Sequence, residues 1–152
     1  MTTTVKVCLV TLLIGVPAFL LAPPAPFGPT IWPAPVPLMP APTEGQVKLL
    51  MLYGAFEAVA LGLGVALVIL GWRLVRQATT ADKGRALAMY LGTAWLLGNW
   101  WFHDALHIVS GMSPVALVWI EWGFHGTLIA AGMALAWCFA TLDWQRGAPR
   151  AA

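Results

Sequence analysis

The sequence has very few charged residues. Asp, Glu, Lys and Arg make up 9% of the 152 residues, whereas hydrophobic residues make up 60%. A soluble domain usually carries about 25% charged residues, so a soluble fold of this length would lack the polar groups to cover its surface. The shortage excludes a water-soluble globular domain and indicates that lipid is the solvent of this chain.

Cysteine is equally scarce, and no single basic patch is present. Cys8 and Cys138 lie inside apolar segments, form no CxxC motif and predict no disulfide framework, so we expect both to be small buried side chains. The net charge is +2, and the positive residues lie at the ends of apolar runs. This distribution excludes nucleic acid as a partner. The GxSxG, HExxH and phosphate-binding glycine motifs of soluble enzymes are also absent from the sequence.

Four apolar segments predict transmembrane helices, because about 20 residues cross the hydrocarbon of a bilayer. They span about 5–22, 47–74, 86–109 and 115–142. The first also resembles a signal peptide, but the prolines after Ala22 disfavour cleavage, so we interpret it as an uncleaved transmembrane helix. We expect the proline-rich segment 23–46 to be extended and outside the hydrocarbon. The predicted fold is an all-α polytopic membrane protein, a four-transmembrane-helix bundle forming one domain, 1–152.

Basic residues predict the orientation of these helices. They collect at the N-terminus, between the second and third segments, and at the C-terminus: Lys6, Arg73, Arg76, Lys83, Arg85, Arg146 and Arg150. Lysine and arginine favour the cytoplasmic side of a membrane. We therefore expect both termini in the cytoplasm, the proline-rich segment outside, and a multi-pass protein of the bacterial inner (plasma) membrane with the lipid bilayer as its partner.

Polar residues interrupt three of the apolar segments at a similar depth. They are Tyr53 and Glu57 in the second, Asn99, His103, Asp104 and His107 in the third, and Glu121 and His125 in the fourth. An ionisable group costs about 2.5–3.5 kcal/mol at the centre of a membrane helix on insertion scales. With a rise of about 1.5 Å per residue, the ionisable groups fall within roughly 12 Å of one another in the outer half of the bilayer. Spacings of four residues place them on one face of each helix, which predicts a polar site between the helices.

Histidine and carboxylate side chains suggest a metal centre. The predicted ligands are His103, His107, Glu121, His125 and Glu57. Imidazole suits iron, copper and zinc, and histidines on facing helices also suit haem. We expect Asp104, Asn99 and Tyr53 to interact with these ligands without contacting the metal, with Asp104 orienting a histidine. No catalytic residue is assigned.

Two other interpretations stay open. A glutamate–histidine pair in an apolar pocket suits proton transfer to a lipid-like substrate, or transport without metal, and predicts a bound apolar ligand. A structural role as an accessory subunit predicts a membrane-protein partner. Two expectations accompany all three interpretations. We expect the tryptophans at 100, 101, 119 and 122 to surround the polar residues. We expect small residues at 54, 58 and 62, and at 126, 130 and 134, to let helices approach closely.

The segment from Asn99 to His107 carries a resemblance. It reads N-W-W-F-H-D-A-L-H and resembles an N-W-W-x-H-D-x-L-H segment of small bacterial integral membrane proteins. Phe102 stands where proline is expected in that pattern. The resemblance covers about a tenth of the chain, and because no activity is assigned to that family, it supports the identity of the polar site but implies no reaction.

Overall fold

The computed structural model describes residues 1–37, 40–78, 82–111 and 113–141, and all regular structure in these ranges is helical. The helices are α1 (Thr3–Leu21), α2 (Glu44–Ala78), α3 (Lys83–Gly98), α4 (Trp100–Ser110), α5 (Pro114–Ile120) and α6 (Gly126–Thr141). A 3-10 turn, η1 (Gly28–Thr30), follows α1, and a π-helical turn, η2 (Glu121–His125), joins α5 to α6. The all-helical class is therefore confirmed.

Three helical stretches are long and apolar enough to cross a membrane. They are Thr3–Leu21, Glu44–Arg73 and Pro114–Thr141, which correspond to the first, second and fourth expected segments. The third expected segment is not one continuous helix. It is divided at Asn99 into α3 and α4, which have 16 and 11 residues, so neither reaches the length of a membrane span alone.

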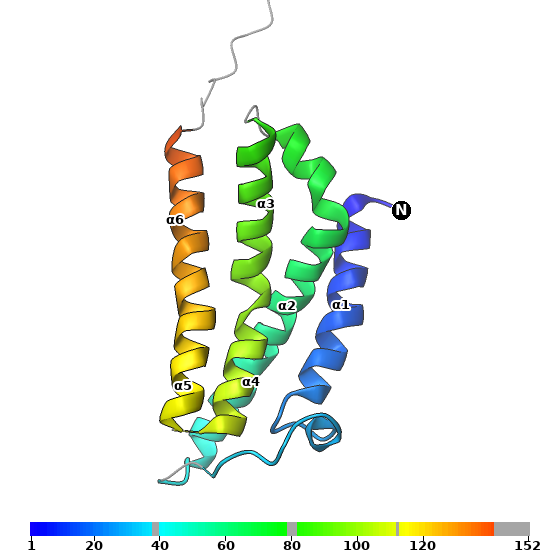
Figure 1. The fold of residues 1–152 in the computed structure, drawn as a ribbon. Helices are drawn as coiled ribbons and strands as arrows, with labels where there is room; N and C mark the ends of the chain where they lie inside the picture. Colours follow the sequence, from blue (N-terminus) through cyan, green and yellow to red (C-terminus); the bar gives the residue numbers. More distant parts are fainter. Residues whose placement is uncertain (38–39, 79–81, 112, 142–152) are drawn as a thin grey trace, which may run out of the picture.

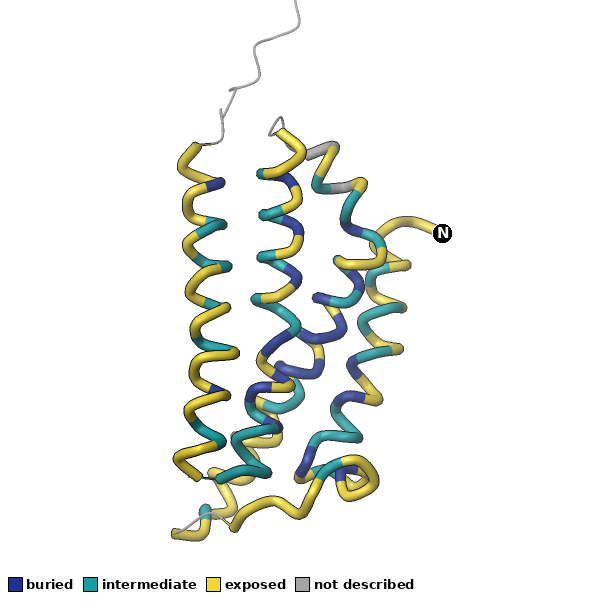
Figure 2. Tube along the Cα trace, viewed as in Figure 1, coloured by how far each residue is buried: buried dark blue, intermediate teal, exposed yellow. Residues whose placement is uncertain are grey.

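The helices follow one another as a row. α1 packs on α2, α2 packs on α3, and α3 packs on α6, in an up-and-down path (Figure 1). The N-terminus and the start of α3 lie at one end, whereas α4, α5 and the proline-rich segment lie at the other (Figure 1). Burial is concentrated in the middle of the row, on α2, α3 and α4, while α5 and α6 are largely exposed or half-buried (Figure 2).

Glycines bring neighbouring helices into backbone contact. A Cβ atom on Gly62 would lie 2.4 Å from the Thr11 carbonyl oxygen of α1, and one on Gly64 would lie 2.9 Å from the Ala94 carbonyl oxygen of α3. Such close approach allows van der Waals contact between helices, which is a main source of their association in lipid. The expected row at 58 and 62 thus contacts α1. A Cβ atom on Gly126 would meet nothing within 4 Å, so the expectation that the second row packs is wrong at this position.

The proline-rich segment is folded over its first part. Turns from Ala22 onwards include hydrogen bonds from the Ala25 amide to the Ala22 carbonyl at 2.8 Å and from the Gly28 amide to the Ala25 carbonyl at 3.0 Å. The Trp32 indole donates to the Leu21 carbonyl at 2.9 Å. The expectation of an extended segment is therefore wrong here, because the amides between the prolines and the Trp32 indole find carbonyl partners within the loop and at the end of α1.

Candidate functional site

Asn99 lies one helical turn before His103, where α3 ends and α4 begins. The Asn99 side chain is fully buried and its amide donates to the carbonyls of Trp95, at 2.6 Å, and Leu96, at 3.3 Å. Side-chain bonds of this kind compete with backbone hydrogen bonds and bend helices. Asn99, an expected supporting residue of the site, therefore interacts with the last turn of α3, and the division between α3 and α4 falls at this residue.

His103 lies at the centre of the site. Its side chain is buried, and its Nδ1 atom lies 2.7 Å from Asp104 Oδ1. The rings of Trp100 and Phe124 flank the imidazole with centroids 5.7 and 5.6 Å away. A carboxylate at Nδ1 favours the tautomer with its proton on Nδ1, which leaves the lone pair of Nε2 free.

His107 follows one helical turn later and meets His103 directly. The two Nε2 atoms lie 3.1 Å apart, and the ring centroids lie 4.5 Å apart. With the His103 proton on Nδ1, its Nε2 is an acceptor. A proton on His107 or a bound cation must then lie between the two nitrogens.

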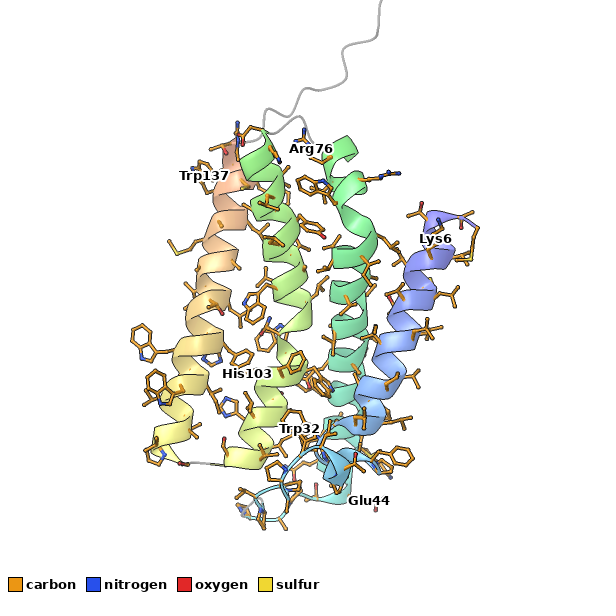
Figure 3. The ribbon with its side chains drawn as sticks, turned by 45° about the vertical axis from the view of Figure 1, so that its right-hand side comes forward. Lys6, Trp32, Glu44, Arg76, His103 and Trp137 are labelled. Atoms are coloured by element: carbon orange, nitrogen blue, oxygen red, sulfur yellow. The ribbon has the colours of Figure 1, made fainter. Side chains whose placement is uncertain are left out.

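Glu121 and His125 approach from the other side, at the two ends of η2. His107 Nε2 lies 3.8 Å from Glu121 Oε1, and the second Glu121 oxygen accepts from His125 Nδ1. The His125 ring centroid is 4.8 Å from that of His103. Figure 3 shows His103 on the side of α4 that faces the helix formed by α5, η2 and α6. π-helical turns often occur at functional sites. Three imidazoles and one carboxylate are thus gathered between α4 and η2.

The fifth expected ligand lies elsewhere. Glu57 is buried on α2 and neighbours the Asp104 carboxyl group and the Tyr53 hydroxyl. It reaches Asp104, which lies at Nδ1 of His103 and not at the Nε2 atom that faces His107. Its Oε1 atom is buried and has no hydrogen-bond partner among the described residues. Glu57 and Tyr53 therefore extend the polar network behind Asp104.

The distances between the gathered groups define what the site can hold. Among the described residues, no group of three His, Cys, Asp or Glu side chains converges closely enough to hold one metal ion. His103 and His107 bring two Nε2 atoms within 3.1 Å of each other. Glu121 and His125 have side chains that are 48% and 42% exposed, so their rotamers are not fixed by packing. One chain thus offers the two imidazole nitrogens of His103 and His107, with the side chains of Glu121 and His125 beside them.

The aromatic surround differs from the expectation. Trp119 and Trp122 are 75% and 77% exposed and do not enclose the site. Phe124, which no sequence pattern singled out, packs on His103 and stacks on Trp95 with ring centroids 6.0 Å apart. The sequence feature that could have identified Phe124 is its position three residues after Glu121, on the same face of a helix. Cys8 is also exposed, contrary to expectation, whereas Cys138 is buried.

No known family model matches the chain, and the comparisons with curated proteins and with solved structures find no match either.

Proposed function

We propose that the chain crosses the bacterial plasma membrane four times as a helix bundle, with α3 and α4 together forming the third span and both termini in the cytoplasm. Lys6 and Arg76 lie at one end of the molecule and Glu44 at the other (Figure 3). Lys48, near the latter end, is paired with Glu44 at 2.5 Å. The collection of positive charge at a single end supports this orientation.

We propose that the protein binds one transition metal ion through His103 and His107, with Glu121 and His125 as further ligands. The distance of 3.1 Å between the two Nε2 atoms carries the proposal. Metal–nitrogen bonds of about 2.0–2.1 Å place two imidazole nitrogens of a tetrahedral zinc ion about 3.3 Å apart. Asp104 at Nδ1 of His103 is the carboxylate support that metal-bound histidines commonly have.

The same distances favour a single zinc, copper or iron ion over haem. Two histidines that bind one haem iron lie on opposite faces of the porphyrin, so two iron–nitrogen bonds separate their rings. His103 and His107 lie on the same helix with centroids 4.5 Å apart, and the His103 and His125 centroids are 4.8 Å apart. Neither pair leaves room for a porphyrin between its rings.

Proton transfer is the second candidate function. Seven polar side chains follow one another as neighbours from α2 through α4 to η2: Tyr53, Glu57, Asp104, His103, His107, Glu121 and His125. Chains of carboxyl and imidazole groups inside membranes form proton relays. The continuity of this chain supports proton exchange with a lipid-like molecule at the exposed Tyr53 end.

Elemental analysis of protein purified in detergent without chelator separates the two functions. Metal binding predicts one transition metal in constant proportion to protein, lost in a His103→Asn/His107→Asn double variant. Glu121→Gln is expected to weaken binding, whereas Glu44→Gln, the same change at the exposed start of α2, is the matched control. Protein that folds but neither contains nor takes up zinc, copper or iron would refute the metal proposal and favour the proton relay.

A further inference from the structure

Two ionisable side chains of the site lie beside the histidines of α4 but stay half-exposed within a helix that is long and apolar enough to cross the hydrocarbon. Glu121 and His125 lie seven and eleven residues after Pro114, or about 10 and 16 Å along the helix from its outer end. Their side chains are 48% and 42% exposed. Ionisable groups at such depths almost always face a bundle interior or a water-filled cavity, because contact with lipid is costly. This side of η2 therefore requires a polar covering.

The same side of the helix continues as a smooth surface. Gly132 and Ala136 lie seven and eleven residues after His125, spacings that return to one face of a helix. Ala136 is exposed, and a Cβ atom on Gly132 would meet nothing within 4 Å. α6 meets α3 through a different face, where Leu135 lies against Gly92 and Cys138 contacts Arg85. Small residues on a bare face let a second helix approach closely.

The four proposed ligands of one chain do not yet converge. No three possible ligands of the described residues converge on one point, although His103 and His107 are well placed and Glu121 reaches only to 3.8 Å from His107. A structural metal site usually has four protein ligands and a catalytic site three. Glu121 and His125 therefore have to move toward His103 and His107 to complete the site, and a molecule that lies against η2 would hold them there.

We propose that a second copy of this chain packs against the face formed by Glu121, His125, Gly132 and Ala136, related by a two-fold axis along the membrane normal. This face is self-complementary, because it carries both a carboxylate and an imidazole, which pair with the same two groups of a symmetric copy. The two copies present the four residues at equal depth, so their Glu121 and His125 side chains are removed from lipid together. The contact rests on the proposed membrane orientation and does not depend on the proposed metal function.

Cysteine crosslinking in native membranes tests the contact. In a Cys8→Ala/Cys138→Ala background, Ala136→Cys is expected to give a crosslinked dimer with a short bis-maleimide. Val16→Cys, on the exposed side of α1, is the matched control and is expected to stay monomeric. A maleimide reagent is preferred because copper-based oxidants would occupy the metal site. Equal crosslinking of both positions, or none at Ala136→Cys, would overturn the proposal.

Mass measurement in lipid nanodiscs provides a second test that needs no cysteine. The unmodified chain is expected to be a dimer, and Gly132→Leu is expected to yield a folded monomer. Gly54→Leu fills open space on α2 instead and is expected to remain dimeric. Metal analysis of the same samples separates the two proposals. A metal-free dimer keeps the contact and refutes the metal function, whereas a monomer with stoichiometric metal refutes only the contact.

Discussion

The indole nitrogen of Trp101 lies 3.0 Å from the Ala18 carbonyl oxygen and so joins α4 to α1 across 83 residues of sequence. Ala18 belongs to the last turn of α1, where backbone carbonyls have no partner within the helix. Trp32 caps Leu21 in the same way and contacts Trp101 edge to face, with ring centroids 5.8 Å apart. Two tryptophans thus supply hydrogen-bond donors to the end of α1, and the bond from Trp101 is buried.

Trp101→Phe is therefore expected to destabilise the protein. The substitution keeps an aromatic ring but leaves the Ala18 carbonyl without its donor, which costs about 1–3 kcal/mol for a buried group. Unfolding of the detergent-solubilised protein with increasing denaturant measures the change. Trp119→Phe is the control, because Trp119 is 75% exposed. Equal stability of the two variants would show that the indole cap contributes nothing.

Gly62→Ala is expected to loosen the contact between α1 and α2. The added methyl group would lie 2.4 Å from the Thr11 carbonyl oxygen, so the helices must separate, and overpacking of this kind costs about 1–3 kcal/mol. Gly54→Ala is the matched control on the same helix, since a Cβ atom there meets nothing within 4 Å. Alanine favours helix over glycine, so the control is expected to be as stable as the original protein or more stable. A loss of stability in both variants would contradict the proposed contact.

Much of the fold was predictable because lipid imposes simple rules on sequence. Long apolar runs, proline-rich breaks and basic ends predicted the all-helical class and the three long apolar helices. The division of the third segment was not predictable, because it depends on where the Asn99 amide finds acceptors within a packed helix. The exposure of Trp119 and Trp122 was not predictable either, because exposed and buried residues of a membrane helix are equally apolar.

The polar residues illustrate the same limit within the site. Spacing of four correctly paired His103 with His107 and Glu121 with His125 on their helices. Whether Glu57 contacts the imidazole nitrogens of His103 and His107 depends on the rotation of α2 about its axis. The apolar residues around Glu57 do not determine this rotation. The structure places Glu57 at Asp104 instead. The π-helical turn, which changes the direction of His125 relative to α6, has no sequence signal that we recognise.

The start of α3 carries a pH-dependent cap. Asp82 accepts from the Arg85 amide at 3.0 Å and pairs with the Arg85 guanidinium at 2.6 Å, and these contacts lower the pKa of Asp82 from its ordinary value of 3.8. A lowered pKa stabilises the folded state above the unfolded value, and this contribution disappears as the pH falls through the folded pKa. Arg85 also donates to the Thr141 carbonyl at 2.9 Å, so the cap lies where α3 meets α6.

Asp82→Asn is therefore expected to lower the thermal midpoint slightly at pH 7 and at pH 5, because asparagine caps a helix as well as aspartate but lacks the charge. The difference should shrink as the pH falls below 3.8. Asp82→Ala removes the cap as well, and its deficit is expected to be larger and to persist in acid. A difference between Asp82→Asn and the original protein that grows in acid would contradict the assigned sign.

Asp104→Asn tests whether the carboxylate at Nδ1 orients His103 for metal binding. The substitution preserves shape but removes the charge that holds the proton on Nδ1, and loss of such a partner typically weakens metal affinity by about 10–100-fold. Competition with a chromophoric chelator measures the affinity for zinc. Asp82→Asn is the matched control, because it makes the same chemical change at the far end of the molecule. In the original protein, affinity is also expected to fall in acid, because protons compete with the metal ion for the imidazole nitrogens. Unchanged affinity in Asp104→Asn, alongside weakened binding in His103→Asn, would mean that His103 is a ligand whose orientation comes from the Trp100 and Phe124 rings instead.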